Sequence, residues 1–313
     1  MMDWTDSHCR YFMRLLNPDI LLYSEMITAE ALLHGSAKKY LHFNNQEHPV
    51  ALQLGGSNPY KLKQSSILAE QEGYDEINLN IGCPSERVQK GSFGACLMED
   101  PNLVADCVDA MINAVDIPIS VKTRIGIDDY DSYEFLYNFI KIVSETGCSR
   151  FIIHARKAIL SGLSPKENRS IPPLNYDRVY RIKSDFKHLH ITLNGGIKNL
   201  DDCKKNLNIL DGVMIGRHAY HQPWFLHELK LLDESAKYDQ LKREDVIELM
   251  YPYIQDQLNQ GNHLKHITRH MLGLYKNQPG ARSWRRYLST HAHNSGAGIE
   301  VLQNALKILP KAA

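Results

Sequence analysis

The sequence predicts an α/β protein: a (β/α)8 TIM barrel whose first strand is missing from this chain, followed by a small C-terminal helical domain. Short strand-like runs alternate with helical stretches, an order typical of parallel strands joined by crossover helices. Nearly every run ends in polar or glycine-rich residues, and barrel enzymes build their sites at those ends. The length of 313 residues suits a barrel of roughly 250 residues with a small addition.

Seven strand-like runs are expected in the first two thirds of the chain. They cover residues 20–27, 49–55, 76–82, 118–126, 151–156, 190–196 and 212–217. The opening residues Met1, Met2, Asp3 and Trp4 look like the end of a strand rather than its start, so we expect a first strand upstream of them. An open sheet of seven strands is the alternative.

Helices are expected between the strands and again after the last one. Between the strands they cover residues 59–72, 101–114, 133–146, 176–186 and 201–208. After Trp224 the strand pattern stops, and apolar residues at helical spacing predict a helix over 243–258. Two further helices are expected over 263–275 and 284–291. We therefore expect two domains, residues 1–235 and 236–313.

Charge is unevenly distributed, although the formal net charge of the whole chain is zero. From Leu241 to the end there are ten Lys and Arg residues against five Asp and Glu residues. A basic end on an acidic body indicates contact with nucleic acid, and a solvated helical surface is the alternative. The polar residues 1–10 contain no apolar segment typical of a signal peptide, and no apolar run reaches the ~18 residues that a membrane helix needs. We therefore expect no signal peptide and a cytoplasmic protein.

Two glycine turns follow the last two strand-like runs. Asn194, Gly195 and Gly196 follow one run, and Gly216 and Arg217 follow the next. Barrel enzymes bind phosphate at this place through backbone N–H groups, which glycine lets approach closely. An arginine adds a charge-assisted fork. The sequence therefore predicts a phosphate site here.

Polar side chains also end three other strands. Gln53, Lys122 and His154 supply an amide, an ammonium and an imidazole, which together could hold a polar heteroaromatic ring. A lysine beside the pyrimidine edge of a flavin would stabilise its reduced anion. For each residue alone, a satisfied surface side chain is the alternative. The sequence contains no glycine fingerprint of a Rossmann site and no P-loop.

Cys83 differs from the other cysteines by its position just beyond a strand, between Gly82 and Pro84. A thiol there could donate a proton as a general acid. None of the six cysteines forms a C-x-x-C pair, so no metal site is expected. We expect the remaining five to be buried as small apolar groups: Cys9, Cys96, Cys107, Cys148 and Cys203.

These segments resemble the dihydrouridine synthases, most closely the A-type enzymes that act on tRNA positions 20 and 20a. The resemblance spans the whole chain and is most specific in the cysteine segment and in the loop over 161–173. The matching stretches are residues 1–6, 52–56, 78–98, 121–124, 154–173, 193–197, 212–224 and 280–289. The family has a strand ending in Pro before the two methionines, and this sequence lacks it.

The resemblance implies that NADPH reduces a bound FMN, which then reduces a uridine of tRNA to dihydrouridine. Cys83 would be the proton donor. It also implies an FMN-binding barrel followed by a helical tRNA-binding domain. We further expect no contact with a membrane and no obligate protein partner. FMN contacts would fall on Met1, Met2, Gln53, Lys122, His154, Asn194, Gly195, Gly196, Gly216 and Arg217, and tRNA contacts on Asn80, Lys166, Arg169, Arg282 and Arg285.

Two alternatives remain open. A flavin oxidoreductase for small molecules, of the dihydroorotate dehydrogenase kind, would share the barrel, FMN and an active-site cysteine. It would not need the cluster of Arg282, Arg285 and Arg286. A non-catalytic RNA-binding protein would need a damaged flavin site, and the presence of Lys122 and Cys83 argues against it.

Overall fold

The computed structural model describes residues 1–232 and 240–310, and the chain packs as two compact units. The first unit combines Met1–Met2, Leu21–Phe43 and His48–Ile215. The second combines Asp3–Ile20 and Asn44–Glu47 with the chain from Gly216 onward. The predicted boundary between residues 235 and 236 lies outside the described residues, so the division into those two domains stays a prediction.

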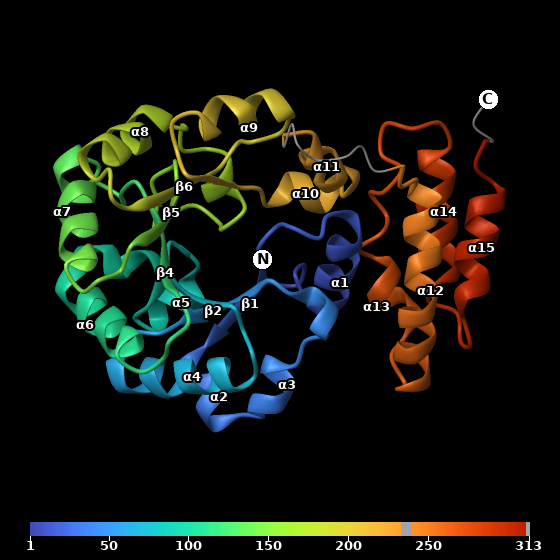
Figure 1. The fold of residues 1–313 in the computed structure, drawn as a ribbon, viewed down its shortest axis with the longest axis horizontal. Helices are drawn as coiled ribbons and strands as arrows, with labels where there is room; N and C mark the ends of the chain where they lie inside the picture. The colour runs from blue at the N-terminus through green and yellow to red at the C-terminus, as the bar shows by residue number, and fades with distance from the viewer. Residues whose placement is uncertain (233–239, 311–313) are drawn as a thin grey trace. The chain divides into compact units, whose positions relative to one another are not determined.

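A parallel sheet of seven strands forms the centre of the first unit (Figure 1). Each strand pairs in parallel with its neighbours in chain order, from β1 to β7. This is the predicted TIM-type arrangement, and it is confirmed. The strands are β1 Leu22–Thr28, β2 Val50–Gly55, β3 Glu76–Ile81, β4 Ile119–Arg124, β5 Arg150–His154, β6 His190–Asn194 and β7 Gly212–Met214.

Five helices surround the sheet on its outer side (Figure 1). Each is preceded by an Asn, Asp or Ser whose side chain accepts a hydrogen bond from a backbone N–H of the first turn, which satisfies a group the helix itself leaves unpaired. These caps explain why the helices begin at or within one residue of their predicted starts. The helices are α4 Pro59–Gln71, α6 Pro101–Ile112, α7 Tyr133–Ser144, α8 Tyr176–Asp185 and α9 Leu200–Leu207.

Short helices fill the remaining connections of the first unit, and the sequence patterns did not predict them. Each has six residues or fewer, too short for an apolar period to be recognised. They are α2 Ala29–His34, α3 Ala37–Leu41, α5 Glu86–Lys90, η2 Gly94–Glu99 and η3 Glu167–Arg169.

The two faces of the sheet differ in chemistry, because successive side chains of a strand point to opposite sides. One face is apolar and fully buried, with Leu52, Leu79, Val121, Ile153 and Leu193 all 0% exposed. Alternate positions of the same strands carry polar side chains, which therefore share the other face. The apolar face supplies the core, and the polar face is available for a site.

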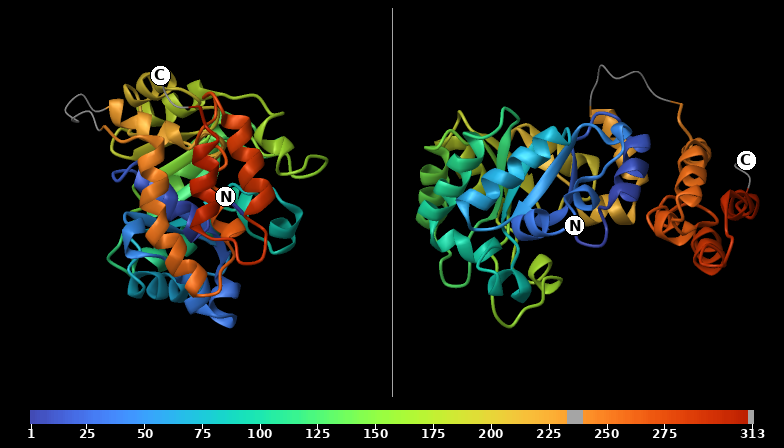
Figure 2. Two further views of the ribbon diagram at one scale, coloured as in Figure 1. Left: turned by 90° about the vertical axis from the view of Figure 1, so that its right-hand side faces the viewer. Right: turned by 90° about the horizontal axis from the view of Figure 1, so that it is seen from below.

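Helices make up the second unit (Figure 2). Helices α12, α14 and α15 lie side by side in Figures 1 and 2. The helices are α1 Ser7–Leu16, η1 Asn45–Glu47, α10 Arg217–His221, α11 Trp224–Glu228, η4 Leu229–Leu232, α12 Arg243–Asn259, α13 Leu264–Thr268, α14 Ala281–His291 and α15 Ile299–Lys307.

Helix α1 was not predicted, and polar contacts between distant residues hold it in the second unit. Arg10 forms an ion pair of 2.6 Å with the fully buried Glu47. Asp6 caps the helix by accepting from the N–H of Cys9, and it also pairs with Arg269 and His270 at 2.5 and 3.0 Å. The polar start of the chain therefore becomes helical through partners that lie far away in the sequence.

The predicted helix over 263–275 is wrong beyond Thr268, where α13 ends. The backbone continues in turns whose N–H groups bond three residues back, as from His270 to Ile267. Gly273 also lies so close to the carbonyl oxygen of His221 that an added Cβ would approach it to 2.5 Å. Packing within the second unit therefore determines the backbone of this segment, although its apolar spacing alone predicts a helix.

No helix among residues 1–232 and 240–310 is long and apolar enough to cross a membrane. The same residues contain no group of three or more His, Cys, Asp or Glu side chains that could hold a metal ion.

Candidate active site

Strand register gathers five of the predicted site residues on the polar face of the sheet. Asn80 on β3 pairs with Lys122 on β4, and His154 on β5 pairs with Asn194 on β6. Gln53 on β2 pairs with the residue two positions before Asn80, so its side chain shares the same face. Residues from five separate parts of the sequence therefore lie on one surface of the first unit.

Asn80 connects this surface to the cysteine segment. Its side-chain oxygen accepts hydrogen bonds of 3.0 Å from the backbone N–H groups of both Gly82 and Cys83. Its amide nitrogen donates to the side-chain oxygen of Gln53 at 2.8 Å. The Cys83 thiol is half-buried and lies 3.5 Å from the hydroxyl of Ser85. One amide thus fixes both the start of the cysteine loop and the orientation of Gln53.

Lys122 lies beside this loop in a low-dielectric environment. Burial and the nearby Arg124 guanidinium lower the pKa of Lys122 to about 8, and an electrostatic interaction with Cys83 opposes that shift. Negative charge placed next to such an ammonium would raise its pKa again, because an opposite charge favours the protonated form. The pKa shift therefore marks Lys122 as a candidate functional residue.

Arg124 is a structural member of the site that sequence reasoning did not assign. Its Nε donates to the carbonyl oxygen of Gly82 at 2.8 Å. Its Nη1 donates to the carbonyl oxygens of Lys157 and Asn168, both at 3.0 Å. Arg124 therefore joins the cysteine loop to the loop that follows β5. Its position two residues after Lys122 on the same strand was the available signal, because both side chains then share a face.

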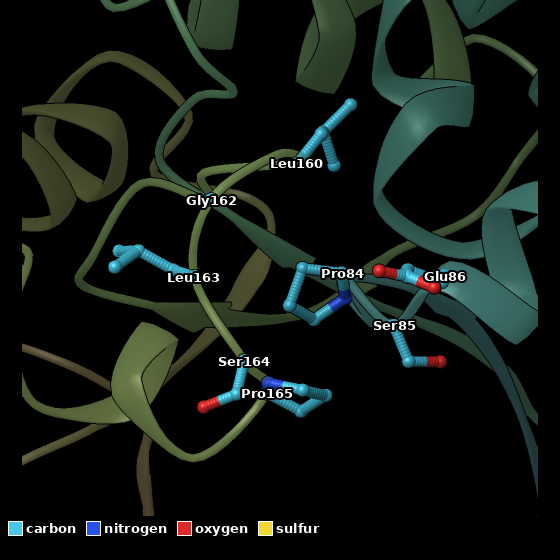
Figure 3. Close-up of a pocket in the computed structure, with 8 residues that line it drawn as sticks. All are labelled: Pro84, Ser85, Glu86, Leu160, Gly162, Leu163, Ser164 and Pro165. Carbon is cyan, nitrogen blue, oxygen red and sulfur yellow. The ribbon is translucent and has the colours of Figure 1, made fainter.

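A pocket of about 390 Å³ lies between these two loops. Figure 3 shows Pro84, Ser85 and Glu86 on one side of the pocket. On the other side it shows Leu160, Gly162, Leu163, Ser164 and Pro165. Gln89 connects the two sides, since its amide nitrogen donates to the carbonyl oxygens of Pro84 and Leu160 at 2.9 and 2.8 Å. Hydrogen bonds therefore connect the two sides of the pocket, and Pro84 on one side directly follows Cys83 in the sequence.

The glycine turn after β6 has a backbone that other residues would adopt only with strain. Gly195 and Gly196 have φ values of +110° and +81°. A Cβ on Gly195 would lie 2.6 Å from the ring of His154, and one on Gly196 would lie 2.6 Å from the hydroxyl of Tyr176. That hydroxyl donates to the carbonyl oxygen of Gly195 at 2.6 Å. Only glycine fits here, so the backbone itself can approach a ligand.

The other predicted residues are distributed over both units. In the first unit, Met1 is half-buried and Met2 is 56% exposed. Lys166 is exposed immediately before η3, and Arg169 ends that helix half-buried. The remaining predicted residues belong to the second unit: Gly216 and Arg217 at the start of α10, and Arg282 and Arg285 exposed on α14.

The expectation for the other cysteines is confirmed for four of them and wrong for Cys96. Burial raises the pKa of Cys107 and Cys148 to about 12 and of Cys203 to about 11, while Cys9 is fully buried. Cys96 is only half-buried. It lies in η2, where residues three apart share a side, and it therefore shares the side of the exposed Glu99.

Comparison with known proteins identifies the family of this chain. The family model for dihydrouridine synthase (Dus) matches residues 1–309. The tRNA-dihydrouridine(20/20a) synthase of Vibrio parahaemolyticus is 60% identical over 314 residues, which cover 99% of this chain and 95% of that protein. The protein of the same name from Escherichia coli K12 is 59% identical over 310 residues, 99% of this chain and 90% of that protein. The chain therefore belongs to the dihydrouridine synthase family.

Proposed function

We propose that this protein reduces the C5–C6 double bond of uridine in tRNA to 5,6-dihydrouridine, at positions 20 and 20a of the D-loop, with NADPH as reductant. Enzymes of its family are flavin-dependent oxidoreductases, and its relatives of about 60% identity are named tRNA-dihydrouridine(20/20a) synthases. The observation that carries the proposal is the hydrogen-bonded group of Gln53, Asn80 and the Cys83 loop beside the Lys122 ammonium.

FMN is the proposed cofactor, and the residues present fit it. The left-handed turn at Gly195 and Gly196 has a backbone without side chains of its own, as close backbone approach to a phosphate requires. Gln53, Lys122, His154 and Asn194 would hold the ring system from the polar face of the sheet. Met1, Met2, Gly216 and Arg217 would complete the binding residues. When bound, FMN supplies the hydride for C6 of the uracil ring.

Cys83 is the proposed acid for the same reaction. Hydride addition at C6 leaves negative charge on C5 and O4, which a proton at C5 quenches. Asn80 holds the backbone of Cys83, and Arg124 holds that of the preceding glycine, so the thiol is carried by a fixed loop. General acid catalysis by a positioned group contributes typically about 10²–10⁴ in rate. The proton therefore moves from Sγ of Cys83 to C5.

Contact with tRNA is assigned to basic and polar residues of both units. Asn80, Lys166 and Arg169 would contact the substrate near the site, and Arg282 and Arg285 would contact the RNA backbone. Unstacking a base costs roughly a few kcal/mol. Phosphate contacts of this kind supply affinity that offsets this cost. With these roles, residues 1–235 form the FMN-binding catalytic domain and residues 236–313 the tRNA-binding domain.

The test is an anaerobic cycle on the purified protein. NADPH should bleach the flavin absorbance, and tRNA that lacks dihydrouridine should restore it. Mapping of the product should place dihydrouridine at positions 20 and 20a. A protein that purifies without flavin contradicts the proposal, and so does a reduced flavin that orotate reoxidises but tRNA does not. The second result would favour a small-molecule oxidoreductase.

A further inference from the structure

A chain of hydrogen bonds runs beneath the candidate site, between the side chains of five residues. The Ser120 hydroxyl donates to Glu76 at 2.6 Å, and the Asn78 amide donates to Ser120 at 2.8 Å. Gln53 donates to Asn78 at 2.8 Å, and Asn80 donates to Gln53 at 2.8 Å. We call Glu76, Ser120, Asn78, Gln53 and Asn80 the polar ladder.

The lower part of the ladder is buried in the first unit. Glu76 is 3% exposed, and Asn78 and Ser120 are 0% exposed. Tyr23 donates to Glu76 at 3.0 Å and Arg150 pairs with it at 3.1 Å, so both carboxylate oxygens have partners. Buried polar groups lower stability unless they are fully paired, and apolar side chains would fill the same space without that requirement. The presence of these polar residues is therefore explained better by a functional role than by core packing alone.

Every bond of the ladder has its donor on the side of the cysteine loop. At the upper end, the backbone N–H groups of Gly82 and Cys83 can only donate, so the oxygen of Asn80 must face them. At the lower end, the carboxylate of Glu76 accepts from Ser120 and from its other two partners. Both ends therefore require the same donor-to-acceptor direction along the ladder. This direction determines where the oxygen and the nitrogen of each intervening amide lie.

We propose that Glu76 and Ser120 are positioning residues, which act through Asn78 to fix the amides of Gln53 and Asn80 in the orientation that the site uses. This inference rests on the proposed function. Loss of the acceptor at the lower end would leave Asn78 free to turn over, and each amide above it could follow. Gln53 would then present its oxygen where its nitrogen now lies, and Asn80 would loosen its hold on the Cys83 backbone.

A double-mutant cycle separates positioning from a structural role. Ser120→Ala should weaken FMN binding to the flavin-free protein by about tenfold, measured by quenching of flavin fluorescence. In a Gln53→Ala background it should change FMN affinity less than about twofold. Likewise, Ser120→Ala should slow reoxidation of the reduced flavin at saturating tRNA by about tenfold without changing the KM for tRNA. An Asn80→Ala background should abolish most of that loss.

The control variants have matched chemistry. Ser66→Ala removes another buried serine hydroxyl, which donates to the carbonyl oxygen of Leu62 at 2.9 Å. It should leave FMN affinity and reoxidation unchanged. Ser120→Thr keeps the hydroxyl and should restore most of both. If Ser120→Ala does not fold, Glu76→Gln replaces it in the same cycles, because the neutral amide can donate and no longer fixes the direction.

Equal losses from Ser120→Ala with and without Gln53 or Asn80 would overturn the proposal, and so would an unchanged FMN affinity. Those results differ from failure of the proposed function, in which tRNA fails to reoxidise the wild-type flavin. The FMN-affinity cycle decides the positioning role even then, because it does not depend on tRNA.

Discussion

The side-chain oxygen of Asn80 accepts a hydrogen bond of 3.0 Å from the backbone N–H of Cys83. A strand residue thereby holds the residue that the proposed chemistry places next to the substrate. Misplacement of a reacting group by about 1 Å can lower a rate by roughly 10². We therefore expect the geometry of this pair to matter to catalysis in addition to the thiol itself.

Asn80→Ala should slow reoxidation of the reduced flavin by tRNA at least about tenfold, because the Cys83 backbone loses its acceptor. Reduction of the flavin by NADPH should continue. Rapid mixing of the reduced protein with tRNA measures the rate of reoxidation. Asn199→Ala is the control, since Asn199 also accepts a backbone N–H, from Asp202 at 2.7 Å, but on α9. Equal rates in the two variants would contradict the role of Asn80.

Cys83→Ala should retain FMN, its reduction by NADPH and tRNA binding. Reoxidation of the reduced flavin by tRNA should slow by at least about 10², because the acid for C5 is lost. Cys96→Ala, in the same segment and also half-buried, should stay within a few-fold of wild type. Near-normal reoxidation in Cys83→Ala would refute the proton-donor role.

Gly195→Ala should lose FMN affinity by at least about tenfold, because its Cβ would displace the ring of His154 in addition to straining the backbone. Gly147→Ala is matched in backbone, with φ of +95° against +110°, but its Cβ would meet nothing within 4 Å. Both variants should lose roughly 1 kcal/mol or more in stability for a left-handed alanine. Titration with FMN and urea unfolding measure the two effects. Equal FMN affinity in the two variants would argue against a flavin site at Gly195.

Lys122 should make stability depend on pH in the flavin-free protein. The pKa of Lys122 is about 8 in the folded state, against 10.5 for an ordinary lysine, with burial as the main cause. The unfolded chain therefore holds more protons between these values, and the free energy of unfolding rises with pH there. Relative to Lys122→Met, wild type should gain about 2 kcal/mol between pH of about 7.5 and about 9.5.

Urea unfolding at the two pH values measures this difference. Lys63→Met removes an exposed lysine of α4 and is the control variant. A difference for Lys122→Met that stays constant, or that changes with pH no more than the difference for Lys63→Met, would mean that Lys122 is not held in a low-dielectric environment.

Arg282→Ala together with Arg285→Ala should weaken tRNA binding and flatten its salt dependence by roughly one slope unit per lost phosphate contact. The two side chains are exposed on α14, three residues apart and so on one face of the helix. Binding measured at several salt concentrations gives the slope. Lys204→Ala with Lys205→Ala removes the same charge from exposed positions on α9 and should leave the slope unchanged. Equal slopes in the two double variants would exclude α14 from RNA binding.

The sequence by itself determined the strands, the main helices and the importance of the strand ends. Alternating and helical apolar spacing are local patterns, and caps such as Asn58 and Asp100 act within one turn of the chain. The position of Cys83 just beyond a strand, between Gly82 and Pro84, was likewise visible from neighbouring residues. Such features depend on residues close in sequence, so a pattern can reveal them.

Only the tertiary structure decided which of these residues meet. Strand register brings Gln53 to Asn80, and a hydrogen bond across two strands joins Glu76 to Ser120. Arg124 donates to a loop 33 residues further along the chain. Asp6, which caps α1, pairs with Arg269, 263 residues away in the sequence. These contacts depend on how distant strands and helices pack, because a hydrogen bond needs two groups within about 3 Å, and no spacing along the sequence specifies that distance.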